Sequence, residues 1–267
     1  MTTALVLSGG GLFGAYQAGA WQALEANGVR PDLIVGASVG SLNGRWIAAG
    51  LSGLELVARW MDPSAGRLTR IAPLYGGLLD RRSLIESAQE LTALPLRIRY
   101  AVTAVRLPRF QTELFVDGDV TWRHLVASCS IPLGYPPTRI SSGWYVDGGL
   151  ICALPVWAAE QLGATRIFTL NVLPYLPSRT LRALSRGLRR VVREVPPQPG
   201  LSKARIISIV PAEPLGPLGT SVNWDATRIG AWIDRGRRDA ERVLAADFKE
   251  TPALAGGERA ETRRREP

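Results

Sequence analysis

The chain has 267 residues, of which 46% are hydrophobic and 21% charged, and its formal net charge is +9. This length and composition suit one large folded α/β domain and exclude a chain that stays disordered for lack of apolar residues. With one histidine and two cysteines, the sequence predicts neither a Cys/His zinc site nor a disulfide framework. It shows no apolar run of ~20 residues and no leader segment, which predicts a cytoplasmic protein.

The first fifty residues show two successive units of strand, turn and helix. Residues 4–7 are a short apolar run that ends in glycines, and residues 15–27 then have helical composition. A second apolar run at 33–36 precedes a helix of small residues from 39 to about 50. Because a βαβα start places parallel strands side by side with helices on both faces, the sequence predicts an α/β fold with a mostly parallel central sheet.

The rest of the chain alternates strands and helices without an internal repeat. Strands are predicted at 96–104, 111–116, 166–172 and 205–210, and helices at 54–60, 81–91, 122–129, 155–162 and 225–245. Prolines at 196–200 predict a surface loop. The polar, charged stretch 251–267 predicts a disordered tail, so we expect one domain over residues 1–250.

The pentapeptide Gly36-Ala37-Ser38-Val39-Gly40 stands between the second predicted strand and the second predicted helix. In such a turn, Gly36 and Gly40 leave room for Ser38 to project its hydroxyl from a sharp bend, and the helix directs its positive end at the serine. This context indicates a nucleophile. The alternative is a plain strand-to-helix turn, since a five-residue pattern occurs often by chance.

A glycine run, Gly9-Gly10-Gly11, follows the first predicted strand and precedes a helix. With no Cβ to block the approach, these backbone N–H groups can hold the negative oxygen of a tetrahedral intermediate. The alternative is a nucleotide-binding turn. A nucleotide-binding turn is disfavoured because it requires an acidic residue at the end of the second strand, whereas Asp32 lies just before the beginning of that strand.

A third motif, Asp147-Gly148-Gly149, lets a turn present a carboxylate, although by itself it is an ordinary turn signal. A serine nucleophile needs a base, and the single histidine is His124. Because His124 lies between Ser38 and Asp147 in the sequence, its order does not fit an α/β-hydrolase triad. The sequence favours a structural role for His124 and points to a serine–aspartate dyad.

Four blocks of the chain, in this order and spacing, resemble the patatin-like phospholipase family. They are SGGGLFGAYQ at 8–17, DLIVGASVGSLN at 32–43, SCSIP at 128–132 and YVDGG at 145–149, and the resemblance covers most of residues 4–172. It implies a three-layer α/β/α fold, a nucleophile at Ser38, a dyad partner at Asp147 and an oxyanion hole from the glycine run, without a cofactor. The chain departs from the family at Phe13, where Lys or Arg is usual, and at Cys152-Ala153, where Asn is usual.

A basic segment over 178–195 is predicted to be an amphipathic helix. Between positions 178 and 205 stand eight basic residues and one acidic residue, while leucines and valines recur at spacings of three and four. Either the segment lies on anionic lipid at the inner membrane surface, or its apolar stripe packs on the domain with the arginines solvated. Nucleic acid is disfavoured because no aromatic residue interleaves. The candidate membrane contacts are Arg182, Arg186, Arg189 and Arg193.

The motifs and the resemblance together indicate a lipid acyl hydrolase. It would cleave phospholipid or neutral-lipid esters through an acyl-enzyme on Ser38, with Asp147 as general base. Two alternatives stay open. An acyltransferase would use the same dyad and differ only in what reaches the acyl-enzyme, and a catalytically weak membrane-surface adaptor of the same fold is suggested by Phe13 and Ala153.

Overall fold

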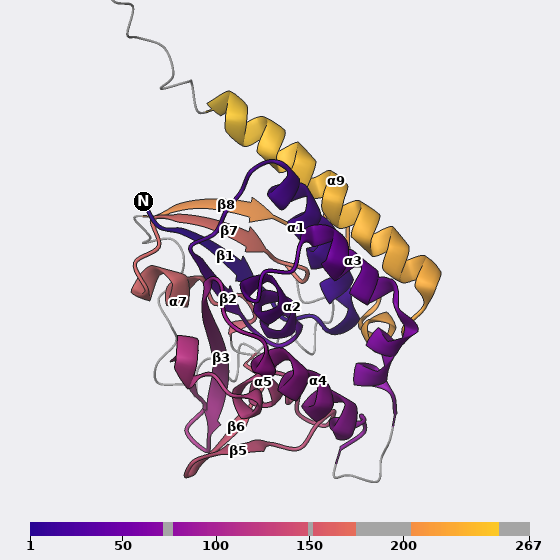
Figure 1. The fold of residues 1–267 in the computed structure, drawn as a ribbon. Helices are drawn as coiled ribbons and strands as arrows, with labels where there is room; N and C mark the ends of the chain where they lie inside the picture. Colours follow the sequence, from indigo (N-terminus) through magenta and orange to yellow (C-terminus); the bar gives the residue numbers. More distant parts are fainter. Residues whose placement is uncertain (72–76, 149–151, 175–203, 251–267) are drawn as a thin grey trace, which may run out of the picture.

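The computed structural model describes residues 1–71, 77–148, 152–174 and 204–250. Their centre is an eight-stranded sheet in the order β5-β6-β3-β2-β1-β7-β8, with β4 also paired to β3 (Figure 1). The strands are β1 (Thr3–Leu7), β2 (Leu33–Gly36), β3 (Arg99–Leu107), β4 (Gln111–Val116), β5 (Thr138–Ile140), β6 (Gly143–Val146), β7 (Arg166–Leu170) and β8 (Arg205–Ile209).

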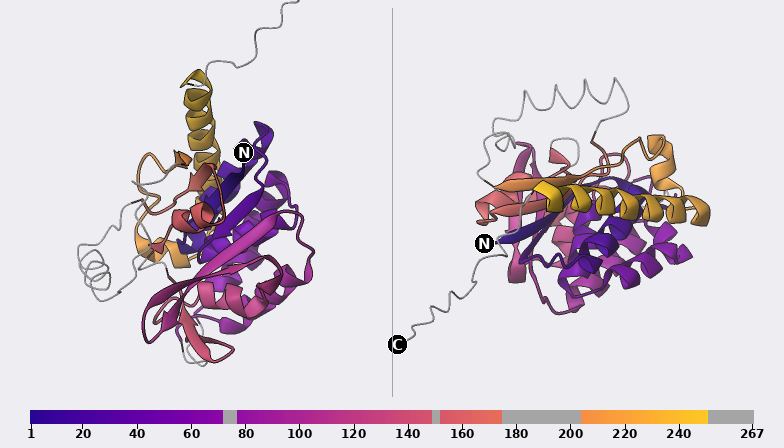
Figure 2. Two further views of the ribbon diagram at one scale, coloured as in Figure 1. Left: turned by 90° about the vertical axis from the view of Figure 1, so that its left-hand side faces the viewer. Right: turned by 90° about the horizontal axis from the view of Figure 1, so that it is seen from above.

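Helices cover both faces of this sheet (Figure 2). One face carries α1 (Gly14–Ala26), α2 (Val39–Ala48), α3 (Gly53–Met61), α4 (Arg81–Ala93), α5 (Trp122–Ser128) and α9 (Ala226–Glu250), and the other carries α7 (Val156–Gln161). Short 3-10 turns are η1 (Gly11–Phe13), η2 (Pro63–Thr69), η4 (Asp117–Asp119) and η6 (Leu218–Val222). None of the described helices is both long and apolar enough to cross a membrane.

The central strand β1 shows why the fold has three layers. Leu5 and Leu7 pack into the large core beneath α1 and α9, whereas Ala4 and Val6 pack into the smaller core beneath α7. All four side chains are fully buried. A strand that is apolar on both faces must be covered on both, as in parallel sheets. The predicted α/β/α fold with a mostly parallel sheet is therefore confirmed.

The long strand β3 organises the mixed half of the sheet. The strand β2 pairs with β3 in parallel, and its last residue, Gly36, lies opposite Val102 of β3. Farther along β3, the strand β6 pairs with it antiparallel, and the last residue of β6, Val146, lies opposite Val105. Because β4 pairs with β3 along both stretches, β2 and β6 must share the other edge of β3. Their carboxyl ends therefore point toward each other along that edge, with two residues of β3 between them.

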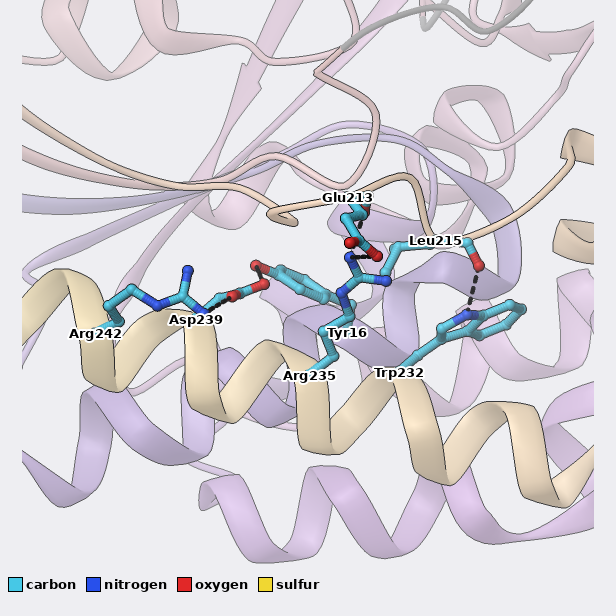
Figure 3. Close-up of polar contacts among 7 residues, drawn as sticks. All are labelled: Tyr16, Glu213, Leu215, Trp232, Arg235, Asp239 and Arg242. Carbon is cyan, nitrogen blue, oxygen red and sulfur yellow. Dashed lines mark hydrogen bonds and ion pairs between the residues drawn. The ribbon is translucent and has the colours of Figure 1, made fainter.

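The helix α9 is fixed to α1 by a buried polar contact, shown in Figure 3. The Tyr16 hydroxyl of α1 donates a hydrogen bond of 3.0 Å to Asp239 Oδ2 of α9. Arg242 Nη2 lies 2.8 Å from the other carboxylate oxygen of Asp239. Burial, followed by the negative charge of Asp239, raises the pKa of Tyr16 well above its usual range. The Tyr16 phenol thus keeps its proton and donates it to this contact.

Most predicted elements are present within a few residues of their expected bounds, and three differences stand out. The strand expected at 96–104 begins only at Arg99, because the N–H groups of Arg97 and Ile98 donate to the Ala48 carbonyl instead of to a strand. The last helix runs to Glu250 rather than 245. The strands β5 and β6 were not predicted. The expected basic helix at 178–195, the loop at 196–200 and the tail at 251–267 lie outside the described residues.

Candidate active site

Ser38 occupies the sharp bend between β2 and α2. Its backbone has φ 52° and ψ −131°, a region that residues with a side chain rarely adopt. The flanking glycines are required here, because a Cβ at Gly40 would overlap the carbonyl oxygens of Leu7 and Ser8 and one at Gly36 would overlap the first turn of α2. Strain of this kind persists only where the surroundings over-determine it.

The end of α5 supplies part of that support. The Ser38 N–H donates a hydrogen bond of 2.9 Å to Ser128 Oγ, and the Ser38 carbonyl accepts one of 2.6 Å from Ser41 Oγ. Ser38 itself is buried, with 4% of its surface exposed. The bend is therefore held by side chains from two helices.

Asp147 follows β6 directly and is nearly buried, with 7% exposed. Its N–H donates a hydrogen bond of 2.9 Å to the Ser130 carbonyl, two residues beyond the serine that binds Ser38. Burial and then the charge of Asp147 raise the pKa of the Cys129 thiol, whose sulfur lies 3.9 Å from Ser41 Oγ. One turn at the end of α5 thus contacts the backbone of both Ser38 and Asp147.

The register of β3 relates the two strands that lead to these residues. Ser38 lies two residues beyond Gly36, whose partner is Val102, and Asp147 lies one residue beyond Val146, whose partner is Val105. Both residues therefore follow strand ends that face each other across two residues of β3.

The glycine run lies beside Ser38, since its strand β1 pairs with β2. A Cβ on Gly9 would lie only 3.0 Å from the Ser38 Cβ. The Gly9 N–H, however, donates a hydrogen bond of 3.0 Å to the Ala153 carbonyl. The N–H groups of Gly10 and Gly11 donate to no partner among the described residues. Of the three predicted donors, Gly9 is thus already engaged, and the other two begin the turn that leads into α1.

A chain of buried amides braces the glycine run. Gln17 Nε2 donates to the Ser8 carbonyl at 2.7 Å, Asn43 Nδ2 donates to Gln17 Oε1 at 2.9 Å, and Trp60 Nε1 donates to Asn43 Oδ1 at 3.0 Å. Sequence reasoning did not single out these positioning residues. A signal was present, because two of the four family-like blocks end at Gln17 and Asn43.

Phe13, where the family usually has a cation, is fully buried. Its ring meets that of Trp232 edge to face, with centroids 4.9 Å apart and an interplanar angle of 77°. Trp232 is in turn fixed by a hydrogen bond of 2.9 Å from Nε1 to the Leu215 carbonyl (Figure 3). The departure at this position thus packs the start of α1 onto α9.

His124 caps the helix that carries it. The Thr121 N–H donates to His124 Nδ1 at 3.0 Å, and the Phe115 ring lies 4.3 Å from the imidazole, centroid to centroid. Burial lowers the pKa of His124, which favours the neutral ring whose Nδ1 can accept this hydrogen bond. These contacts agree with the structural role favoured for His124.

The remaining predicted site residues are placed as follows. Gly148 lies against β3, because a Cβ there would meet Val105 Cγ2 at 3.2 Å. Gly149 and the four arginines of the basic segment lie outside the described residues. The described residues contain no group of three or more His, Cys, Asp or Glu side chains that could hold a metal ion.

Comparison with known proteins identifies the family of the chain. A model of the patatin-like phospholipase family matches residues 5–160, and the chain belongs to that family. Among its relatives, the lysophospholipase nte1 of Aspergillus oryzae is 29% identical over 182 residues, which are 63% of this chain and 12% of that protein. The human patatin-like phospholipase domain-containing protein 6 is 28% identical over 183 residues, which are 64% of this chain and 13% of that protein. The chain therefore spans a small part of the length of these relatives.

A solved structure shows the same fold. VipD from Legionella pneumophila superposes with a TM-score of 0.53 at 14% sequence identity, covering 92% of this chain and 67% of that one. At this identity the likeness concerns the arrangement of the strands and helices alone.

Proposed function

We propose that this chain hydrolyses carboxylic esters of lipids, with Ser38 as nucleophile and Asp147 as general base. One observation supports the proposal: the carboxyl ends of β2 and β6 face each other on one edge of β3, and the strained serine and the buried aspartate follow these two ends. The family and the lysophospholipase name of the Aspergillus oryzae relative support a lipid ester as substrate.

The reaction would proceed in two steps. Asp147 takes the proton of the Ser38 hydroxyl as its oxygen attacks the ester carbonyl, and the carboxylic acid then gives that proton to the leaving alcohol. The resulting acyl-enzyme is attacked by water, from which Asp147 takes a proton, and Asp147 then returns this proton to the Ser38 oxygen as the bond to the fatty acid breaks. All protons in this scheme pass through Asp147.

The negative oxygen of each tetrahedral intermediate needs donors, and we assign them to Gly10 and Gly11. Their N–H groups have no partner among the described residues and stand at the start of η1 and α1, where the helix dipole adds positive potential. One such donor typically contributes roughly 3 kcal/mol to lowering the barrier. Gly9 contributes space instead, since its missing Cβ allows the loop to approach Ser38.

A fluorophosphonate probe followed by mass spectrometry tests the assignment. We expect an adduct on Ser38, none in Ser38→Ala and slower labelling in Asp147→Asn. His124→Gln, which keeps a helix-capping side chain, is the matched control and should label at the rate of the unmodified chain. Absence of an adduct on Ser38 in the folded protein would refute the proposal and favour the adaptor alternative.

A substrate panel then defines the reaction. Neutral glycerides, lysophospholipids and diacyl phospholipids are compared for released fatty acid, with and without an added alcohol as acyl acceptor. Transfer to the alcohol at the expense of free acid would favour the acyltransferase alternative. We further propose that anionic lipid is contacted by Arg182, Arg186, Arg189 and Arg193. A variant in which all four arginines are replaced by glutamine should bind anionic vesicles less tightly, and unchanged binding would reject that role.

A further inference from the structure

Four aliphatic side chains are exposed together at the end of the sheet that carries α4 and α5. The exposed fractions are 76% for Ile71, 57% for Leu78, 38% for Ile131 and 86% for Leu133. Hydrogen bonds join their segments, because the Leu78 N–H donates to the Leu133 carbonyl at 3.2 Å and Ile71 bridges to the next residue, Leu79. We call these four residues the apolar rim.

Leu133 is the most informative member of the apolar rim. Its φ of 71° lies in the left-handed region, which disfavours residues with a side chain and suits glycine or asparagine. Its apolar side chain is also the most exposed of the four. Neither feature stabilises the fold, so a leucine here indicates contact with something outside the chain.

The apolar rim stands on an ordered loop. The Ile131 N–H donates to the Cys129 carbonyl at 2.8 Å, and the N–H groups of Gly134 and Tyr135 both donate to the Ile131 carbonyl at 2.9 Å. The loop starts immediately after Ser130, whose carbonyl holds the backbone of the proposed base. A surface that contacts the apolar rim would therefore lie next to the proposed catalytic site.

Two exposed arginines lie on segments that adjoin the apolar rim. Arg70 directly precedes Ile71, and Arg139 lies in strand β5, a few residues after Leu133. Aliphatic groups that enter a bilayer, together with nearby guanidinium groups that bind phosphate, match the surface of an anionic membrane.

We propose that the apolar rim docks the protein on anionic lipid bilayers, with Leu133 inserted in the interface beside the catalytic site. This inference rests on the proposed function for the reason to approach lipid, but docking itself is measured without turnover. It is also separate from the arginines of the basic segment, because it depends on an aliphatic contact that salt does not screen.

The test is co-sedimentation with vesicles of phosphatidylcholine containing phosphatidylglycerol. Leu133→Asn removes the apolar side chain while keeping a residue that tolerates the left-handed backbone, so its melting temperature should not fall. We expect its vesicle affinity to fall about tenfold or more, at low and at high salt. Leu54→Gln, at a position on α3 that is 69% exposed, is the matched control and should bind as the unmodified chain does.

Three results would overturn the docking proposal. The first is equal vesicle binding by Leu133→Asn and the unmodified chain, and the second is an equal loss in Leu54→Gln. The third is a dimer in light scattering that Leu133→Asn converts to monomer, which would make the apolar rim a contact between two copies. The proposed function is tested separately, because labelling of Ser38 and hydrolysis of a dissolved short-chain ester need no vesicle. If both are absent, the proposed function is refuted, whereas the docking proposal is still decided by the vesicle-binding result.

Discussion

The hydrogen bond from the Ser38 N–H to Ser128 Oγ makes Ser128→Ala an informative change. Ser128 is fully buried and the bond is 2.9 Å long. Removing the acceptor leaves a buried N–H without its partner, which costs about 1–3 kcal/mol. The strained backbone of Ser38 costs a similar amount, of order 1–3 kcal/mol. The bond is therefore large enough to decide whether the bend keeps its shape.

We expect Ser128→Ala to lower kcat about 10- to 100-fold. A loss of roughly 1.4–2.7 kcal/mol in support for the bend reduces the fraction of molecules with Ser38 in the reactive conformation by that factor. The change removes no group of the proposed oxyanion hole and leaves Asp147 untouched, so KM should move much less than kcat. The assays are hydrolysis of a dissolved ester and the rate of fluorophosphonate labelling, both at a temperature where the variant is folded.

Ser130→Ala is the control in the same turn. Ser130 is equally buried, and its Oγ donates to the Val126 carbonyl at 2.8 Å and lies 2.9 Å from Thr138 Oγ1. Its carbonyl, which accepts from Asp147, remains in the variant. Both variants should lose stability, but kcat should fall strongly only in Ser128→Ala. Equal loss of kcat in the two variants, or none in Ser128→Ala, would refute the reasoning.

Three further changes test other parts of the structure. Tyr16→Phe leaves Asp239 without its buried donor, so the free energy of unfolding in urea should fall by about 1.5–3 kcal/mol, and an unchanged value would contradict this role. Burial lowers the pKa of His124 below its unfolded value of about 6.5, so the stability that the neutral ring contributes is present above that pH and is lost as the pH falls. Between about pH 7 and 5, the melting temperature should therefore drop less in His124→Gln than in the unmodified chain. Gly11→Ala puts a Cβ 2.7 Å from the Ser221 carbonyl oxygen at φ 58°, so kcat should fall up to about 100-fold as the proposed donor moves, and full activity would exclude Gly11 from the oxyanion hole.

The parts of the fold that were predictable are those with local signals. The apolar runs of β1 and β2 and the glycines at the bend of Ser38 each report their own conformation, and the structure places them within a residue or two of the predicted bounds. The strands β5 and β6 have three and four residues, too few for a clear alternation. Their local signal was the dipeptide Ser142-Gly143, which marks a turn but does not report the strands on either side of it.

The site was predictable only in part for a related reason. Ser38 is specified by its immediate neighbours, but the place of Asp147 depends on which edge of β3 the strand β6 joins, and nothing near Asp147 in the sequence reports that. The sequence predicted that the Gly9 N–H would be a donor to the oxyanion. In the structure this N–H donates to the Ala153 carbonyl, which lies more than a hundred residues away in the sequence, so no local signal could reveal that it is engaged. Contacts between distant segments decide these details, and a single sequence does not show them.

A dyad without histidine makes strand register part of the proposed catalytic machinery. An aspartate reaches only one methylene beyond its backbone, and a one-residue slip of β6 against β3 would turn Asp147 to the opposite face of the sheet, away from Ser38. A polar cluster across three strands opposes such a slip: Tyr145 of β6 donates to Glu113 Oε2 of β4 at 2.7 Å, and Arg106 of β3 lies 3.3 Å from the other oxygen of Glu113. A one-residue shift of β6 would take Tyr145 away from Glu113, whereas the ion pair between Arg106 and Glu113 joins β3 to β4 and would remain. The Tyr145 contact therefore helps to fix the register on which the proposed approach of base and nucleophile depends.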